Sequence, residues 1–199
     1  MNNPVPSDNQ PIPDGLVAAV DEAVAELQGG ITYVLAAVIF GEPYAARQDA
    51  QHLIADRTRR FHWHREGPTA RSAAVELIAT HAIATSIFVQ RASRQAQTAT
   101  RANLLTELVA ELANDGVRHV VIESRGSRED GRDRATILNC FRERSVATLS
   151  YDWRTKVEPL LWYPDAMAGV VREQIINGRS TRFDYLQRTR TVTDVRYLG

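Results

Sequence analysis

A chain of 199 residues with 44% hydrophobic residues can bury the core of one domain. It has no apolar run as long as a membrane span, and its Asn/Pro-rich start is not a signal peptide, so we expect a cytoplasmic protein. The 24 basic residues, of which Lys156 is the only lysine, balance 24 acidic residues, which excludes an overall basic field but not a local basic groove. The single cysteine, Cys140, excludes an intrachain disulfide, and its apolar helical surroundings predict a buried structural thiol.

The start of the chain has one ambiguous element. Residues 1–14 are polar, and we expect a flexible lead-in there. In the next stretch, 15–28, apolar residues recur with helical spacing, which slightly favours an amphipathic helix ended by Gly29-Gly30. The same stretch also fits a first strand that ends at Asp21 and leads into a hairpin.

The middle of the chain carries clearer patterns. Residues 31–40 are apolar on both faces and predict a central strand. The elements expected after it are a helix at about 44–58, a helix at 68–81, a strand within 83–90 and an amphipathic helix at 98–113.

A short stretch that starts at Phe61 also fits a strand. A period of two would place Phe61 and Trp63 on one face and His62, His64 and Glu66 on the other. We expect His62 and His64 to contact the phosphate of a substrate or to support residues that do. A structural role at a sheet edge is the alternative.

The second half of the chain begins with an acidic strand. Residues 117–123 predict a buried strand with Glu123 at its carboxyl end, where ligands collect in open α/β sheets. The polar stretch 125–133 predicts a loop. The remaining expectations are a helix at 134–144, a strand at 147–153, a helix at 164–177 and weak strand character at 191–197 within a C-terminal extension, 179–199. This order predicts one α/β domain over 15–178 with a mixed sheet.

Three acids have the chemistry of a divalent-metal site, which needs several carboxylates from different elements. Asp21 and Glu123 would each end a strand, and Asp165 would lie in the first turn of a helix. Ala168 and Gly169 follow on the face of that helix, and a face so bare leaves room for metal ions and a phosphodiester. Alternatively, the helix dipole alone favours the acid, and the small residues allow close packing on the sheet.

Four stretches in order resemble the motifs of a widespread bacterial family, most closely its actinobacterial branch. The family is a domain of unknown function with a ribonuclease-H-like fold. The stretches are Val20-Asp21-Glu22-Ala23 with Tyr33-Val34-Leu35-Ala36-Ala37-Val38, then Phe61-His62-Trp63-His64-Arg65-Glu66, then Val121-Ile122-Glu123-Ser124-Arg125, and finally Leu161-Trp162-Tyr163-Pro164-Asp165-Ala166-Met167-Ala168. Together they cover roughly 15–178.

The resemblance implies that 16–22 is a strand with Asp21 at its catalytic end. It also implies a catalytic site of Asp21, Glu123 and Asp165 that binds Mg²⁺ or Mn²⁺. The implied activity is that of a metal-dependent nuclease, which hydrolyses phosphodiester bonds.

The resemblance also bears on the surroundings of these acids. Glu66 is implied as a fourth metal ligand, with Glu76 as the alternative. Ala23 stands where the family has a serine, so a hydroxyl beside the first acid is lost. Arg125 and Arg128 follow the acidic strand and are candidates to hold a phosphate backbone, against the alternative of a solvated charged loop.

The expected partner is nucleic acid, either DNA or RNA, and no membrane; a homodimer is compatible with the sequence. The alternative function is a catalytically inactive nucleic-acid-binding or protein-interaction module of the same fold. The lost hydroxyl and the neutral overall charge motivate it.

Overall fold

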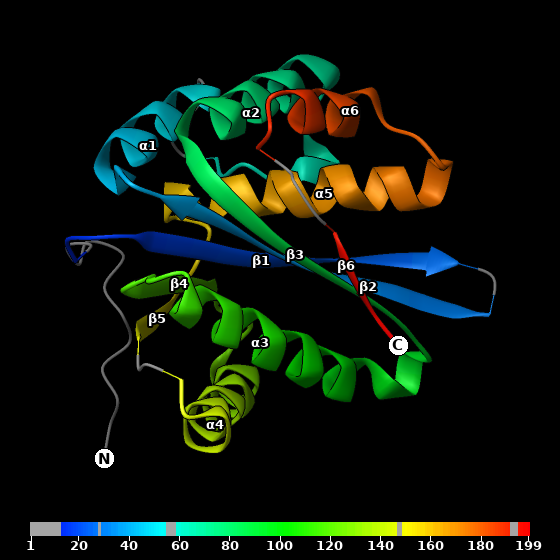
Figure 1. Cartoon of the computed structure of the whole chain (residues 1–199). Coiled ribbons are helices and arrows are strands. Elements are labelled where there is room, and N and C mark those ends of the chain that lie inside the picture. The colour runs from blue at the N-terminus through cyan, green and yellow to red at the C-terminus, as the bar shows by residue number, and fades with distance from the viewer. Residues whose placement is uncertain (1–12, 28, 55–58, 147–148, 192–194) are drawn as a thin grey trace.

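The computed structural model describes residues 13–27, 29–54, 59–146, 149–191 and 195–199. Most of the lead-in expected at 1–14 lies outside these residues. The strands are β1 (Val17–Leu27), β2 (Gly30–Phe40), β3 (Ala82–Ala92), β4 (His119–Glu123), β5 (Ser150–Arg154) and β6 (Arg196–Leu198). They form a six-stranded mixed sheet in the order β5-β4-β1-β2-β3-β6, with helices on both faces (Figure 1). The mixed α/β architecture expected from the sequence is therefore confirmed.

The ambiguous first element is a strand. β1 pairs with β2 in antiparallel register from Val17↔Phe40 to Leu27↔Gly30, and with β4 in parallel on its other side. Strand pairing on both sides buries the first half of β1 on both faces, which outweighs the weak helical spacing. The strand is longer than expected, because its hairpin with β2 carries it past Asp21 to Leu27.

The other strands follow the predictions closely. The expected strands at 31–40, 83–90 and 117–123 correspond to β2, β3 and β4. The strand expected at 147–153 begins at Ser150, with 147–148 outside the described residues, and β4 and β5 run parallel. β6 falls at the end of the weak strand pattern and pairs in parallel with β3.

The helices form two layers, one on each face of the sheet (Figure 1). One layer contains α5 (Trp162–Asn177) directly against the sheet, with α1 (Pro43–Ala50), α2 (Pro68–His81) and α6 (Thr181–Arg188) around it. The other layer contains α3 (Gln97–Asn114) and α4 (Ser127–Arg144). Each layer shares an apolar core with the sheet face that it covers, and Cys140 is buried in the second core, as expected.

The strand expected to start at Phe61 was wrong. Trp63–Arg65 is a single 3₁₀ turn, closed by hydrogen bonds from the Arg65 amide to the His62 carbonyl and from the Glu66 amide to the Trp63 carbonyl. The indole of Trp63 instead packs on α5. The alternation of apolar and polar residues therefore reflects one buried side chain in a turn, and not a sheet face.

The loop expected at 125–133 was also wrong from Ser127 onward, because α4 begins there. Asp130 accepts hydrogen bonds from the Ser124 hydroxyl and the Arg125 amide, which ties the end of β4 to the first turn of α4. Glu129 and Asp130 in that turn are favoured by the helix dipole. The charged residues that suggested a loop therefore stabilise the start of a helix.

Two smaller findings complete the fold. The helix expected at about 44–58 ends at Ala50 and continues as a 3₁₀ turn, Gln51–Leu53, with 55–58 outside the described residues. Among the described residues, no helix combines the length and the apolar character needed to cross a membrane.

A glycine on α5 provides a test of this packing. A Cβ at Gly169 would lie 2.3 Å from the Trp63 ring, so Gly169→Ala should lower the free energy of unfolding by roughly 1–3 kcal/mol. Gly131→Ala in α4 is the matched control, because its Cβ would meet no described atom within 4 Å and should raise stability by roughly 0.5–1 kcal/mol. Urea unfolding followed by circular dichroism measures both. Equal stability of the Gly169→Ala variant and the wild type would contradict the packing.

Candidate active site

Two of the predicted acids lie side by side on neighbouring parallel strands, Asp21 within β1 and Glu123 at the carboxyl end of β4. The pairing of β1 with β4 ends at Val20↔Ile122, so Asp21 and Glu123 each follow the last pair. Successive side chains of a strand point to opposite faces. Asp21 therefore faces the α5 layer and Glu22 faces the α3 layer, in keeping with the two cores that their neighbours join.

Asp165 reaches the same place from the first turn of α5, the helix that packs across β1 and β2. Its side chain is nearly buried, and its Oδ2 accepts a hydrogen bond of 2.8 Å from the backbone amide of Trp63. The turn that replaced the expected strand thus holds one of the acids in place.

The three acids converge on one cation, the ammonium of Lys156. Its Nζ lies 2.8 Å from Asp165 Oδ1, 3.0 Å from Asp21 Oδ2 and 3.7 Å from Glu123 Oε1. Only 9% of the lysine side chain is exposed. The predicted triad is therefore brought together, with a resident positive charge at its centre.

The segment between β5 and α5 fixes the backbone of Lys156. The buried indole of Trp162 donates a hydrogen bond of 2.9 Å to the Lys156 carbonyl. Two residues before the lysine, Arg154 donates to the Glu158 carboxylate at 2.8 Å, and Glu158 in turn accepts a hydrogen bond from the Leu160 amide. This buried ion pair and cap hold the residue that points into the acids.

Burial and like charge act together on these acids. Burial raises the pKa of Asp21 well above its usual value, and a side-chain hydrogen bond with Glu123 raises it further, against the opposing ammonium of Lys156. Burial also raises the pKa of Asp165, as does the charge of Asp21. Burial opposes the charge on Lys156, but the carboxylates around it outweigh burial and raise the pKa of the ammonium. The cluster thus favours a bound positive charge.

One acid oxygen remains poorly satisfied. Asp21 Oδ1 accepts a hydrogen bond of 2.7 Å from the Glu22 amide. Asp21 Oδ2 is buried, and its contact of 3.0 Å with the Lys156 ammonium does not have the geometry of a good hydrogen bond. An unsatisfied buried carboxylate oxygen is costly, and it is a natural ligand for a hard cation.

The proposed fourth acid lies elsewhere. Glu66 forms an ion pair of 3.0 Å with Arg59, and Glu76 is exposed on α2. Among the described residues, the carboxylates that contact Lys156 are the three described above. The structure therefore brings together three of the four acids expected to bind metal.

The two histidines border the cluster. Burial lowers the pKa of His62, and the nearby charge of Lys156 lowers it further, while Asp165 acts in the opposite direction. The ring centroids of His62 and His64 are 5.9 Å apart. His64 is exposed and lines a pocket of about 360 Å³ together with Asp165 and Arg172. A solvent-accessible hollow thus adjoins the acids.

The bare face of α5 is partly filled, although Gly169 also lines the pocket of about 360 Å³ beside Asp165. The space beside Gly169 is filled by the indole of Trp63, which would collide with any Cβ there. Arg71 and Arg182 lie over the same ring, 5.1 and 5.7 Å from its centroid. The absence of a side chain at Gly169 therefore serves close packing, which was the alternative explanation.

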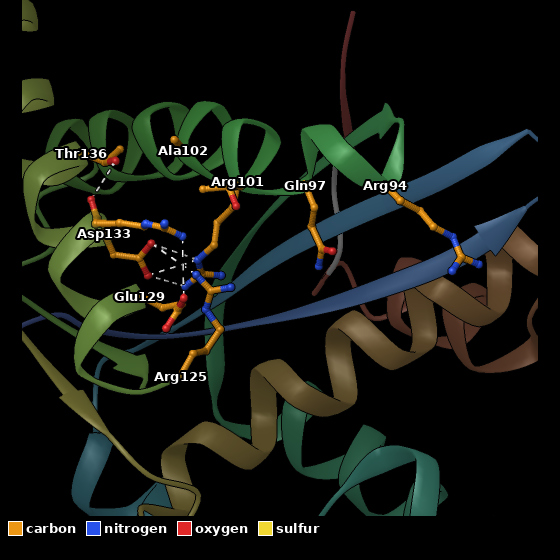
Figure 2. Close-up of a pocket in the computed structure, with 10 residues that line it drawn as sticks. Arg94, Gln97, Arg101, Ala102, Arg125, Glu129, Asp133 and Thr136 are labelled. Atoms are coloured by element: carbon orange, nitrogen blue, oxygen red, sulfur yellow. Dashed lines mark hydrogen bonds and ion pairs between the residues drawn. The ribbon is translucent and has the colours of Figure 1, made fainter.

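Glu22 belongs to a second ionic cluster on the other face of β1. It forms an ion pair with Arg101. Arg101 also donates to Asp133 at 2.7 Å, as Figure 2 shows, and both of these partners are buried. Arg125 lies 3.5 Å from Glu22 and 3.6 Å from Asp133, and it lines a pocket of about 510 Å³. Arg128 is exposed on the first turn of α4. The predicted role of these two arginines in substrate binding remains a prediction.

The three carboxylates have the chemistry of a Mg²⁺ or Mn²⁺ site, but their spacing is that of a site for an ammonium. Among the described residues, no group of three or more His, Cys, Asp or Glu side chains is spaced to hold a metal ion. The acids surround an ammonium at 2.8–3.7 Å, whereas Mg²⁺ binds oxygen at about 2.1 Å. The type of ligand is suitable for a divalent ion, because three elements offer carboxylate oxygens and one of these, Asp21 Oδ2, is buried without a hydrogen bond of good geometry.

Sequence reasoning missed Lys156 as a site residue. A signal was present, because this lysine is the only one in a chain that otherwise uses arginine. Arginine is a rigid fork that suits bidentate pairs, whereas lysine is a compact point charge on a flexible stem. A position that requires a compact cation among several acids is one where lysine and arginine are not interchangeable.

No family model matches the chain, and neither does any curated protein. Among solved structures, the chain is similar to RNase HII in its complex with PCNA from Archaeoglobus fulgidus. The TM-score is 0.50, the sequence identity is 14%, and 87% of each chain is covered. The chain is thus an α/β protein with a ribonuclease-H-like fold, as the sequence predicted.

The raised pKa of Asp165 predicts that removal of its charge increases the stability of the protein in a pH-dependent way. Because folding raises this pKa, ionisation of the carboxyl costs stability as the pH rises from the unfolded pKa through the folded one. In Asp165→Asn the amide oxygen can still accept the Trp63 hydrogen bond. The free energy of unfolding of this variant, relative to the wild type, should therefore increase over that pH window and then level off. Urea titrations in the presence of a chelator measure it.

Asp152→Asn is the control with the opposite sign. Burial opposes ionisation of Asp152, but hydrogen bonds with His119 and Arg154 outweigh it and hold the pKa below its usual value. The stability contributed by the ionised carboxyl is present above the unfolded pKa and is lost as the pH falls through the folded pKa. This variant should therefore lose stability relative to the wild type as the pH rises. The same trend in both variants would contradict the assigned electrostatics.

Proposed function

We propose that the protein hydrolyses phosphodiester bonds of nucleic acid with the help of a divalent metal ion. One observation carries the proposal. Asp21, Glu123 and Asp165 come from the middle of β1, the carboxyl end of β4 and the start of α5, and their carboxylates meet around one cation position on a ribonuclease-H-like fold. A shared cation position lined by carboxylates is the arrangement that metal-assisted phosphodiester hydrolysis requires.

The three acids would hold Mg²⁺ or Mn²⁺. When bound, the ion would polarise the phosphate and lower the pKa of water. The acids themselves would keep the ion between β1 and the carboxyl end of β4, close to the pocket of about 360 Å³ that Asp165 lines. Glu66, which pairs with Arg59, has no part in this proposal as a ligand.

The neighbouring side chains supply substrate contacts. The lowered pKa of His62 favours a neutral imidazole at pH 7, which can donate a hydrogen bond to a phosphate oxygen from one ring nitrogen. The exposed His64 extends the same edge, and Arg125 and Arg128 follow Glu123 along the chain. We propose these four residues as contacts for the phosphate backbone of DNA or RNA.

We propose that the chain is related to the bacterial family with the ribonuclease-H-like fold and shares its site. The motifs that carry the resemblance contain Asp21, Glu123 and Asp165, and these are the acids that surround Lys156. We also propose the cytoplasmic location expected from the sequence, and a homodimer as one oligomeric state to test.

A second function is favoured by the lysine itself. The ammonium of Lys156 balances part of the negative charge of the acids, and the acids are spaced for that ammonium. A protein that retained the fold but lost metal catalysis would keep such an internal ion pair. The alternative is therefore a catalytically inactive module that binds nucleic acid or another protein.

Cleavage and binding assays separate these functions. The wild type is incubated with single-stranded and double-stranded DNA and RNA and with a hybrid duplex, in Mg²⁺ or Mn²⁺. We expect cleavage that falls by roughly a hundredfold or more in Asp21→Asn, since even partners of metal ligands contribute 10–100-fold. Asp115→Asn, which removes an exposed carboxylate at the end of α3, should cleave like the wild type.

The other results assign the alternatives. Gel-shift binding without cleavage across several metals would contradict the nuclease and support the nucleic-acid-binding module. Absence of both binding and cleavage at low salt would instead support a protein-interaction module. Cleavage that persists in Asp21→Asn would place the active site elsewhere in the protein.

A further inference from the structure

We propose that Lys156 is a built-in competitor of the metal: its ammonium occupies the cation position of the acid cluster, and a divalent ion binds there by displacing the lysine side chain. This inference rests on the proposed function and concerns the regulation of the same site. It assigns a role to a residue that neither the motifs nor the comparison with RNase HII singled out.

The position of the ammonium is the first support. Nζ lies within 3.7 Å of a carboxylate oxygen from each of β1, β4 and α5, so it sits where a shared cation has to sit. The lysine stem is almost fully buried, at 9% exposure. An ammonium and a metal ion in the same carboxylate cluster would repel each other at short range, so the two cations exclude each other.

The second support is the incomplete satisfaction of the acids. A lysine ammonium has three hydrogens to donate, yet buried Asp21 Oδ2 receives no hydrogen bond of good geometry from the described residues. Asp165 Oδ1 is the oxygen closest to Nζ, at 2.8 Å, and Glu123 Oε1 is the most distant. One ammonium therefore leaves ligand capacity in the cluster that a divalent ion can use.

The third support is that the anchor of Lys156 lies in its backbone. The hydrogen bond from the Trp162 indole reaches the carbonyl, and the ion pair of Arg154 with Glu158 fixes the chain on either side. Within the described part of the chain, the ammonium itself is held by the acids that would bind the metal. Rotation about the bonds of the flexible side chain can thus release it while the fold stays intact.

A purely structural ion pair makes a different prediction. If Lys156 only neutralised the acids, its side chain would stay in place in the presence of metal, and its loss would not improve metal binding. If it competes, its removal must tighten metal binding, because three buried acids then lack a cation. The two roles therefore differ in the direction of one measurable change.

Calorimetric titration with Mn²⁺ measures that change. Lys156→Met, which keeps the length and apolar stem of the side chain, should bind Mn²⁺ at least roughly tenfold more tightly than the wild type. Arg144→Met is the matched control, because it also removes one positive charge, from an exposed ion pair with Glu107 on the other side of the sheet. The control should bind Mn²⁺ like the wild type.

The single lysine allows a second measurement that needs no substitution. Lysine labelled with ¹³C and ¹⁵N gives one side-chain spin system in this chain, that of Lys156. Titration of the wild type with Mg²⁺ should shift its Cε and Nζ signals, with saturation at the concentration that calorimetry gives. Mn²⁺ should then broaden the same signals. This readout keeps the inference testable even if Lys156→Met fails to fold without metal.

The outcomes distinguish this inference from the proposed function. Equal Mn²⁺ affinity of wild type and Lys156→Met, or weaker binding by the variant, would overturn the competition and leave a metal-dependent nuclease standing. Lysine signals that stay unchanged while Mg²⁺ binds would do the same. Failure of both proteins to bind any Mn²⁺ would overturn both ideas. Tighter binding by Lys156→Met, lost again when Asp165→Asn is added, would support both.

Discussion

The charge balance beside the carboxyl end of β4, where Asp21 of β1 and Asp165 of α5 meet Glu123, is the constraint on which the rest of the site depends. Asp21 and Asp165 are nearly buried, and Glu123 is their half-buried neighbour. Carboxylates taken out of water without a counter-charge cost several kcal/mol each, so this arrangement requires a cation. Lys156 supplies it, and the Trp162 hydrogen bond and the Arg154–Glu158 pair position that lysine. A site that must always contain a cation is equipped to exchange one cation for another.

The pleat of β1 divides the acids between two ionic clusters. Asp21 and Glu22 are adjacent in sequence, but one faces α5 and the other faces α3. Glu22 joins the buried pair of Arg101 and Asp133, so that each of these two carboxylates has an arginine partner. That cluster is close to neutral and tied by charge-assisted hydrogen bonds, whereas the Asp21 cluster has more carboxylates than cations. The imbalance points to the α5 side as the place for chemistry.

The sequence predicted the strands and long helices because their patterns are set by burial. β2, α2 and α3 have strong apolar periodicity, and they lie where they were expected. β1 needed the family resemblance, since pairing with two neighbours overrides local spacing. The turn at Trp63 and the start of α4 could not be predicted, because one depends on the space beside Gly169 and the other on the side chain of Asp130. Spacing alone could not predict the convergence of Asp21, Glu123 and Asp165, which the family resemblance implied, and the lysine between them comes from a loop without a periodic signal.

The most direct measurement is a crystal structure of the wild type grown with Mn²⁺, with anomalous diffraction at the manganese edge. An anomalous peak among the carboxylates of Asp21, Glu123 and Asp165, with the Lys156 side chain turned out of the cluster, is the predicted result. An ordered Lys156 ammonium still among the three acids at saturating Mn²⁺, with any manganese bound elsewhere, would contradict the assignment of this cluster as a metal site.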